Sequence, residues 1–172
     1  MDVARLGDLS TVFVIDLASR RVQILGSTPF PTDPFMRQVV RTMTAPDDGL
    51  LVRQRLLICD RDTKWSAPVR ARLAEVGIRV VQTPLQAPNF NAYAERFVRS
   101  IKQECLNRVV PFGDRHLRWM IAEYVAHYHR ERNHQGRANE LIERLPTGAG
   151  NLGRIRRRQR LGGLLNYYCR AA

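Results

Sequence analysis

Two runs of hydrophobic residues open the chain, and a short polar link separates them. Residues 11–17 (TVFVIDL) and 21–26 (RVQILG) are dominated by apolar and β-branched side chains. Runs of this length and composition are typical of strands that are at least half buried. Because the link at residues 18–20 is so short, the pattern predicts a β-hairpin.

Helical spacing follows the hairpin. Apolar side chains recur at helical intervals over residues 34–44, and Thr32 or Asp33 can cap the helix that this spacing predicts. The apolar run at residues 54–59 then predicts a short strand. An acid, Asp60, stands directly at the C-terminal end of that strand.

A second helix and strand come next. Ser66 can cap a helix that Gly77 ends, since glycine adopts a left-handed C-terminal cap without strain. Residues 78–82 predict another strand. The segment 83–91 (TPLQAPNFN) contains two prolines and two asparagines, which predict an irregular loop.

Two amphipathic helices complete the pattern. The first carries an apolar stripe at intervals of four residues, formed by Tyr93, Phe97, Ile101 and Cys105. Asp114 can cap the second helix. Its expected inward face is formed by Leu117, Ile121, Tyr124, Val125 and Tyr128.

This order of strands and helices predicts an α/β fold. A chain of 172 residues, of which 44% are hydrophobic, is long enough for one well-buried core and too short for two ordinary domains. We therefore expect a single folded domain over residues 1–145. Residues 146–172 are predicted to form a basic C-terminal tail.

The charge of the chain favours a polyanionic partner. Lysine and arginine number 28 against 16 acidic residues, for a net charge of +12, and nucleic acid is the leading candidate. All of these cations except Lys64 and Lys102 are arginines, which suit bidentate phosphate contacts, although a GC-rich genome produces the same bias. Beyond Gly153 the chain has no acid but six arginines, namely Arg154, Arg156, Arg157, Arg158, Arg160 and Arg170.

The cysteines and the hydropathy exclude several other classes of protein. The three cysteines are far apart and odd in number, which argues against a zinc ribbon or a disulfide scaffold. Four histidines lie in the C-terminal half, but no cysteine is near them and we expect no structural zinc. No apolar run is long enough to cross a bilayer, and the first 20 residues lack the pattern of a signal peptide. These observations predict a cytoplasmic, nucleoid-associated protein with no membrane partner.

Acidic residues are placed where phosphoryl transfer by two metal ions needs them. That chemistry gathers several carboxylates around hard divalent cations, commonly from strand ends and an adjacent helix. Asp60 ends a strand, and Glu95 lies in the first turn of a helix 34 residues further along. Asp2 stands at the start of a further short strand. Strand-end acids are common, and the helix dipole alone also favours an acid at the position of Glu95.

Four segments together resemble the integrase catalytic core of insertion-sequence transposases and retroviral integrases, the DDE superfamily. Residues 15–22 (IDLASRRV) resemble its second and third strands. Residues 56–65 (LLICDRDTKW) resemble the strand with the second catalytic Asp. Residues 83–105 resemble its mobile loop and glutamate-bearing helix, and 124–136 (YVAHYHRERNHQG) the end of the core. The resemblance implies an RNase H-like mixed sheet flanked by helices.

The resemblance implies a role for each of three acids. Asp60 and Glu95 match the second and third catalytic positions, and counting back along the family core reaches Asp2 for the first. Asp8 and Asp16 are competing candidates for that first position. The three acids Asp2, Asp60 and Glu95 are then expected to bind Mg²⁺ or Mn²⁺. Asp62 ranks below Asp60 as a ligand, because it can simply solvate the loop.

With Asp2 as the first acid, the chain is expected to begin inside the first strand of the core. The strand is then predicted to be frayed. The helical DNA-binding region that precedes such cores is also expected to be absent, as in a truncated reading frame.

Basic residues supply the expected DNA-binding surface. Arg99 and Lys102 lie four and seven residues after Glu95, on the same helical face, and matching family positions contact the DNA backbone. An ordinary solvated helix face is the simpler alternative. The arginines Arg156, Arg157 and Arg158 of the tail are predicted either to bind DNA or to form a disordered, solubilising end.

The resulting functional hypothesis is cleavage and strand transfer of DNA in transposition or integration by two-metal phosphoryl transfer. Transposon ends and target DNA are the expected partners, and the resemblance implies assembly as a homo-oligomer. The main alternative is an inactive, truncated fragment that only binds DNA. An RNase H-like nuclease acting on RNA is a third reading, which the transposase-like segments disfavour.

Overall fold

The computed structural model describes residues 1–45, 51, 54–62, 64–84, 91–143 and 153–170. The chain divides into two compact units. Unit 1 comprises Met1–Ile15 and Gln23–Val98, and unit 2 comprises Asp16–Val22 and Arg99–Ala172. The predicted break between a core and a tail, after residue 145, falls outside the described residues.

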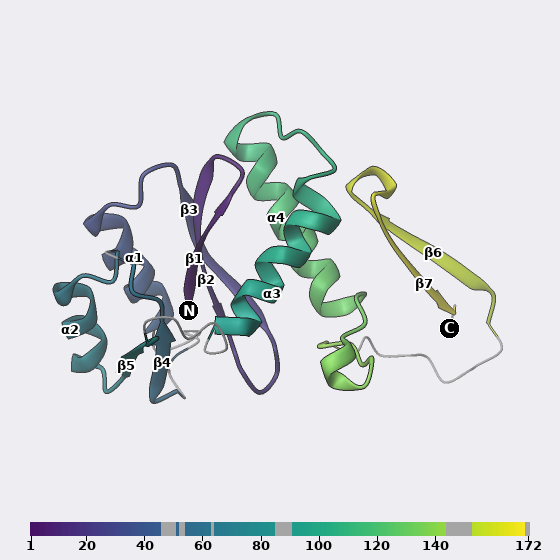
Figure 1. Ribbon diagram of the computed structural model, residues 1–172. Coiled ribbons are helices and arrows are strands. Elements are labelled where there is room, and N and C mark those ends of the chain that lie inside the picture. Colours follow the sequence, from purple (N-terminus) through teal and green to yellow (C-terminus); the bar gives the residue numbers. More distant parts are fainter. Residues whose placement is uncertain (46–50, 52–53, 63, 85–90, 144–152, 171–172) are drawn as a thin grey trace. The chain divides into compact units, whose positions relative to one another are not determined.

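A three-stranded sheet in the order β1-β2-β3 begins unit 1 (Figure 1). Its strands are β1 (Asp2–Leu6), β2 (Leu9–Ile15) and β3 (Val22–Thr28). β2 and β3 confirm the predicted hairpin with slightly shifted ends. β1 is antiparallel to β2, and all five of its residues are in register, from Asp2 opposite Phe13 to Leu6 opposite Leu9. Along its edge with β2 the strand is therefore not frayed, contrary to the expectation, while a truncated first strand stays a prediction.

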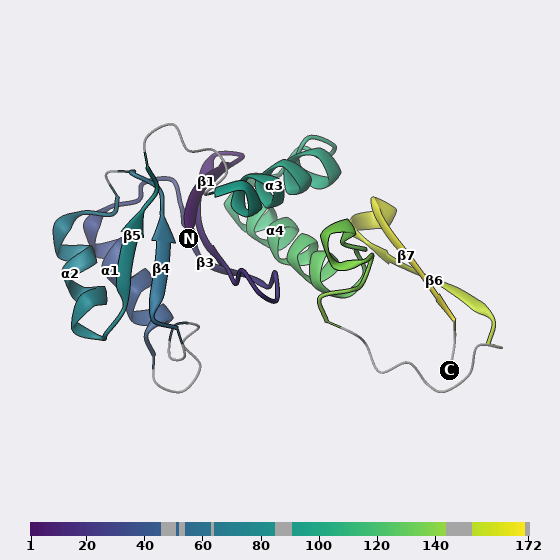
Figure 2. The same cartoon turned by 60° about the horizontal axis from the view of Figure 1, so that its bottom comes forward.

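The rest of unit 1 alternates helices and strands, as the sequence pattern predicts. The elements are α1 (Asp33–Met43), β4 (Leu56–Cys59), α2 (Ala67–Glu75) and β5 (Arg79–Gln82). β4 and β5 are parallel, with Leu56 opposite Arg79 and Cys59 opposite Gln82, and Figure 2 shows them side by side with α2 near β5. The α2 helix joins them as the crossover that a parallel pair requires.

One apolar core holds the elements of unit 1 together. Helical spacing on α1 turns Met36, Val39, Val40 and Met43 inward. They belong to a buried cluster whose other members include Val12 and Val14 of β2, Leu57 and Cys59 of β4, Trp65, and Val69 and Leu73 of α2.

The ends of α2 show how the local sequence sets its limits. Ser66 is the N-cap residue, as predicted, although its side chain makes no capping hydrogen bond. Gly77 follows the helix at φ +79°, a left-handed conformation that glycine adopts more readily than other residues. The Gly77 N–H donates to the carbonyl of Ala74 at 2.9 Å, so the predicted glycine stop is confirmed.

The first of the two predicted C-terminal helices changes its winding along its length. α3 (Ala92–Ile101) is α-helical, and the π-helical turn η2 (Lys102–Leu106) continues it. The N–H of Asn107 donates to the carbonyl of Lys102 at 2.9 Å, a bond that spans five residues. The predicted α-helical stripe thus extends only to Ile101, although Cys105 is buried as expected.

In unit 2 the long helix α4 (Gly113–Arg130) contacts η2. Leu117, Ile121, Tyr124 and Tyr128 are buried, as the spacing predicts. The helix begins one residue before Asp114, and Phe112 occupies the N-cap position. The prediction of Asp114 as the cap was therefore wrong, and this acid lies in the first turn, where it still suits the helix dipole.

The segment after α4 folds back and holds the turn between β2 and β3. The guanidinium of Arg137 donates to the carbonyls of Ala18 and Ser19, both at 3.2 Å. The last turn of α4 contributes as well, since Nε2 of His129 accepts the N–H of Val22 at 2.9 Å. These contacts explain why residues 16–22 belong to unit 2.

The arginine-rich C-terminal segment is not a loose tail. β6 (Ile155–Arg160) and β7 (Leu165–Arg170) form an antiparallel hairpin, drawn in yellow in Figure 1. The 3₁₀ turn η4 (Leu161–Gly163) joins them with positive φ angles of 52°, 64° and 94°. Of the two alternatives for this segment, the disordered end is therefore wrong for residues 155–170.

None of the helices in the described ranges has both the length and the apolar character needed to cross a lipid bilayer.

Candidate active site

Asp2 is fixed at the first residue of β1. Its side chain is buried, and its Oδ1 accepts the N–H of Val3 at 2.8 Å. Its Oδ2 accepts a hydrogen bond of 2.9 Å from Nδ2 of Asn91, the residue just before α3. This bond holds the beginning of α3 beside the carboxylate of Asp2.

Asp60 stands where β4 ends, as the sequence predicts. Its Oδ1 accepts the indole N–H of Trp65 at 2.8 Å and the backbone N–H of Asp62 at 3.3 Å. Trp65 is only 1% exposed, so its indole cannot turn away. The orientation of the Asp60 carboxyl group is therefore set by the core of unit 1.

The structure brings Asp2 and Asp60 together. The α-amino group of Met1 donates to the carbonyl of Ile58 in β4, which places the start of β1 next to the end of β4. Burial raises the pKa of Asp60 to about 6, helped by a side-chain hydrogen bond with Asp2 and by the negative charge of Asp2. Two carboxyl groups in contact resist simultaneous ionisation. A divalent cation with oxygen ligands would relieve that repulsion.

A second charged group lies near this pair. Burial lowers the pKa of the Met1 α-amino group, while the negative charges of Asp2 and Asp60 act in the opposite direction.

Glu95 lies on the first turns of α3, and its side chain is exposed. It follows Asn91 by four residues, which is about one helical turn or about 6 Å along the axis. Within the described part of the chain, no three His, Cys, Asp or Glu side chains are grouped so that they could hold a metal ion. The structure thus joins two of the three predicted acids, and the role of Glu95 stays a prediction.

The competing acids have structural roles of their own. Asp16 accepts both the N–H and the hydroxyl of Ser19, at 2.6 and 2.7 Å, and these bonds lower its pKa. It thereby shapes the turn between β2 and β3. Asp8 is exposed in the turn after β1. Asp62 pairs with Lys64 at 2.6 Å, which gives it a structural role in the loop.

The predicted DNA-contacting residues of the helix differ in surroundings. Arg99 is exposed on α3, one turn after Glu95, whereas Lys102 is partly buried and begins the π-helical turn. Because the winding changes at Lys102, the regular α-helical spacing that predicts a shared face with Glu95 applies to Arg99 alone.

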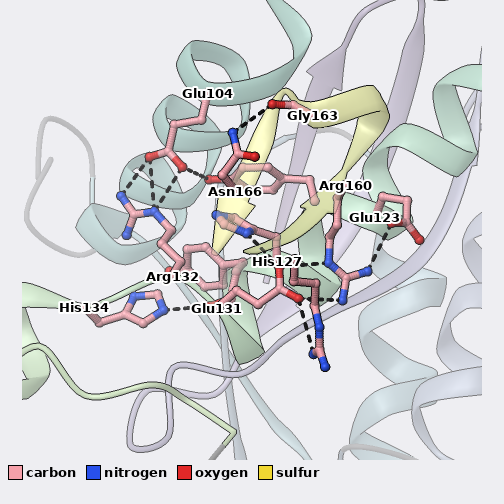
Figure 3. Close-up of polar contacts among 12 residues, drawn as sticks. Glu104, Glu123, His127, Glu131, Arg132, His134, Arg160, Gly163 and Asn166 are labelled. Atoms are coloured by element: carbon pink, nitrogen blue, oxygen red, sulfur yellow. Dashed lines mark hydrogen bonds and ion pairs between the residues drawn. The ribbon is translucent and has the colours of Figure 1, made fainter. Parts of the chain in front are cut away.

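A buried carboxylate ties the C-terminal hairpin to α4 (Figure 3). Glu131, whose side chain is 1% exposed, accepts Nε and Nη2 of Arg160, both at 2.9 Å. Oε2 of Glu131 also lies 3.0 Å from Nδ1 of His127, and Glu123 accepts a hydrogen bond of 3.0 Å from Nη1 of Arg160. Burial opposes ionisation of Glu131, but the bonds from Arg160 and His127 hold its pKa below the ordinary value.

A second ion pair joins η2 to the segment that follows α4. Glu104 of η2 accepts Nε and Nη2 of Arg132, the latter at 2.8 Å, and also the hydroxyl of Tyr124 at 3.0 Å. The guanidinium of Arg132 lies 5.7 Å from the ring centre of Tyr128. Tyr124, Tyr128 and Arg132 belong to the segment that resembles the end of the integrase core, and here their contacts are structural.

The histidines of this segment take part in the packing of unit 2. Burial lowers the pKa of His129 to about 4, consistent with Nε2 accepting the N–H of Val22. Burial also lowers the pKa of His134, whose Nε2 lies 2.7 Å from the carbonyl of Tyr128.

Two residues that hold the acids were not predicted as part of the site. Trp65 orients Asp60, and Asn91 binds Asp2. Both lie inside the segments that resemble the family core. Each carries an N–H donor within five residues of a predicted acid, Asp60 or Glu95, and this donor was the feature of the sequence that could have pointed to them. Their contacts span 5 and 89 residues, and the longer one cannot be inferred from spacing.

Comparison with known families agrees with the resemblance seen in the sequence. Residues 76–140 match the integrase core domain family, a match consistent with the catalytic core of a DDE transposase or integrase. The matched segment contains Glu95, α3 and α4, whereas Asp2 and Asp60 precede it. No curated protein matches the chain.

Proposed function

We propose, starting from the integrase core domain match, that this chain is the catalytic core of a transposase or integrase that cleaves DNA and transfers its strands. The observation that carries the proposal is the contact between Asp2 and Asp60, at the adjacent ends of β1 and β4. Sheets β1-β2-β3 and β4-β5 would then belong to one RNase H-like mixed sheet.

The two acids suit a divalent cation by their chemistry. Both offer carboxylate oxygens, which are the ligands that Mg²⁺ and Mn²⁺ prefer. A bound cation would supply charge for the attacking and leaving oxygens of a phosphodiester. Asp2 and Asp60 would hold it, while Trp65 and Asn91 keep their carboxyl groups in place.

Glu95 is the proposed third ligand. The bond between Asn91 and Asp2 holds the first turn of α3 beside the acid pair. Glu95 lies about one turn further along the helix, and its exposed side chain is free to change rotamer toward the pair. Arg99, one turn beyond, would then contact the phosphates of DNA held at the site.

A noncatalytic DNA-binding role is the second candidate. It is favoured by a specific observation, since the described residues do not assemble three metal-binding side chains. The net charge of +12 supports binding to DNA under either proposal.

Nicking of labelled duplex DNA in the presence of Mn²⁺ separates the two candidates. The parent chain should nick DNA, and Asp60→Asn and Glu95→Gln should each abolish it. Asp8→Asn removes the same charge from an exposed turn and should leave nicking unchanged. DNA binding by the parent without any nicking would support the noncatalytic role instead.

A further inference from the structure

The C-terminal hairpin presents two chemically different faces. Side chains alternate between the faces of a strand, and the register pairs Arg158 with Tyr167 and Arg157 with Tyr168. One face therefore carries Arg156, Arg158, Arg160, Leu165, Tyr167 and Cys169. The other carries Ile155, Arg157, Gln159, Asn166, Tyr168 and Arg170.

The first face, here the docked face, is directed at α4. Leu165 is buried, and Arg160 binds Glu123 and Glu131 (Figure 3). Arg158 also approaches Glu131, with Nη1 at 3.7 Å from a carboxylate oxygen. Two arginines of this face thus meet two carboxylates, so their positive charge is largely neutralised within the protein.

The second face, here the outer face, keeps its positive charge. Nε of Arg157 donates to the side-chain oxygen of Asn166 at 2.8 Å, and the Gln159 amide, with its oxygen turned toward the guanidinium, accepts from Nη2 at 2.8 Å. Arg170 donates to the backbone carbonyl of Gly153 at 3.3 Å. These acceptors are all neutral, so they hold the guanidinium groups in place without neutralising them.

Exposed apolar side chains lie among these cations. Tyr168, directly opposite Arg157, is 62% exposed, and Ile155, opposite Arg170, is 61% exposed. No acidic residue occurs anywhere in the hairpin. Two fixed arginines with a tyrosine between them favour a phosphate-bearing polymer as the ligand of this face.

We propose that the outer face of the hairpin is a binding surface for the backbone of duplex DNA. A two-stranded ribbon fits the width of the major groove, and the ion pairs of Arg160 fix the ribbon on α4 from behind. Arg157 and Arg170 contact phosphates, and Tyr168 packs against the sugar-phosphate chain. The proposal deepens the proposed function, on which it rests. It also assigns different roles to Arg157, which binds DNA, and Arg158, which faces α4, although the two are neighbours in one basic run of the sequence.

The experiment is a titration of a labelled DNA duplex with the full chain, with binding measured by fluorescence anisotropy. EDTA is present so that no cleavage occurs. Arg157→Gln with Arg170→Gln should weaken binding roughly 10- to 60-fold near 0.1 M salt, because each lost phosphate contact removes about 0.9 from the salt slope. The slope should therefore fall by about 2. Restoring charge with Arg157→Lys and Arg170→Lys should recover most of the slope.

A matched control removes two exposed arginines from another element. Arg37→Gln with Arg41→Gln on α1 changes the net charge equally and should weaken binding less than about threefold. The proposal is overturned by an equal loss in this control, by unchanged duplex binding in the hairpin variant, or by a loss confined to single-stranded DNA. Circular dichroism and melting of each variant verify that the fold is retained.

The experiments distinguish a failure of the proposed catalytic function from a failure of the proposed binding surface. A parent chain that never nicks DNA, but whose duplex binding depends on Arg157 and Arg170, would retain the binding surface and lose the catalytic role. Normal nicking at saturating protein, together with unchanged duplex binding by the hairpin variant, would retain the catalytic role and rule out the binding surface.

Discussion

Replacing Asp60 by asparagine should stabilise the metal-free protein at neutral pH while abolishing the proposed activity. Asparagine has the shape of aspartate, and its oxygen can still accept the indole N–H of Trp65. The amide nitrogen can donate to Asp2, so the contact between the two side chains is kept. Only the negative charge beside Asp2 is lost.

The size of the effect follows from the pKa of Asp60. Burial and the contact with Asp2 raise it from 3.8 to about 6, and each unit corresponds to about 1.4 kcal/mol. The upper limit is therefore about 3 kcal/mol, which solvent screening of this half-buried group reduces to about 1–2 kcal/mol. Because the folded-state pKa is raised, the penalty is absent below the unfolded value and grows as the pH rises from about 4 to about 6.

Urea unfolding in EDTA at about pH 4 and about pH 7.5 measures this difference. Asp60→Asn should exceed the parent by about 1–2 kcal/mol at the higher pH and match it at the lower. Other titrating groups, such as His129, are common to both chains and cancel. A variant that is less stable than the parent at neutral pH, or a difference that does not change with pH, would refute the reasoning.

Two further predictions concern unit 2. Glu131→Gln should destabilise the chain by about 2–4 kcal/mol in urea unfolding, because the partly buried Arg160 loses the buried one of its carboxylate partners and keeps Glu123. Glu75→Gln at an exposed ion pair should change stability by less than about 0.5 kcal/mol. Equal effects would show that the hairpin is not held by Glu131. Titration of the histidine ring protons by NMR should give a midpoint near 4 for His129, and a midpoint near the ordinary value would mean that His129 does not accept the N–H of Val22.

Periodicity in the sequence predicts most elements of unit 1. The apolar positions of α1 and α2 recur at helical spacing, and Gly77 ends α2 at a positive φ. β4 ends at Cys59, so Asp60 occupies the predicted strand end. These features are local, since each depends on residues that are close together in the chain.

The hairpin at the C-terminus was hidden by its composition. Three consecutive arginines, Arg156 to Arg158, conceal the alternation of faces, because a charged side chain occupies both sides of β6. The glycines Gly162 and Gly163, at positive φ, were the available turn signal. The docking of Arg160 on Glu131 depends on a contact across 29 residues, which no local pattern reveals.

The candidate site was predictable in part. Strand ends and the family resemblance point to Asp2 and Asp60, and the structure brings these two acids into contact. The residues that fix them, Trp65 and Asn91, act through tertiary contacts. The described residues do not join Glu95 to this pair, and its role as the third acid stays a prediction.

The central claim is that the acids bind a divalent cation, and a Mn²⁺ titration of the full chain tests it most directly. Binding is measured as the loss of the EPR signal of free Mn²⁺. The account predicts saturable binding that Asp60→Asn and Glu95→Gln each weaken by at least about tenfold, about 1.4 kcal/mol, and that Asp8→Asn leaves unchanged. Absence of Mn²⁺ binding by the parent chain, or equal binding by the parent and the Asp60→Asn variant, would contradict it.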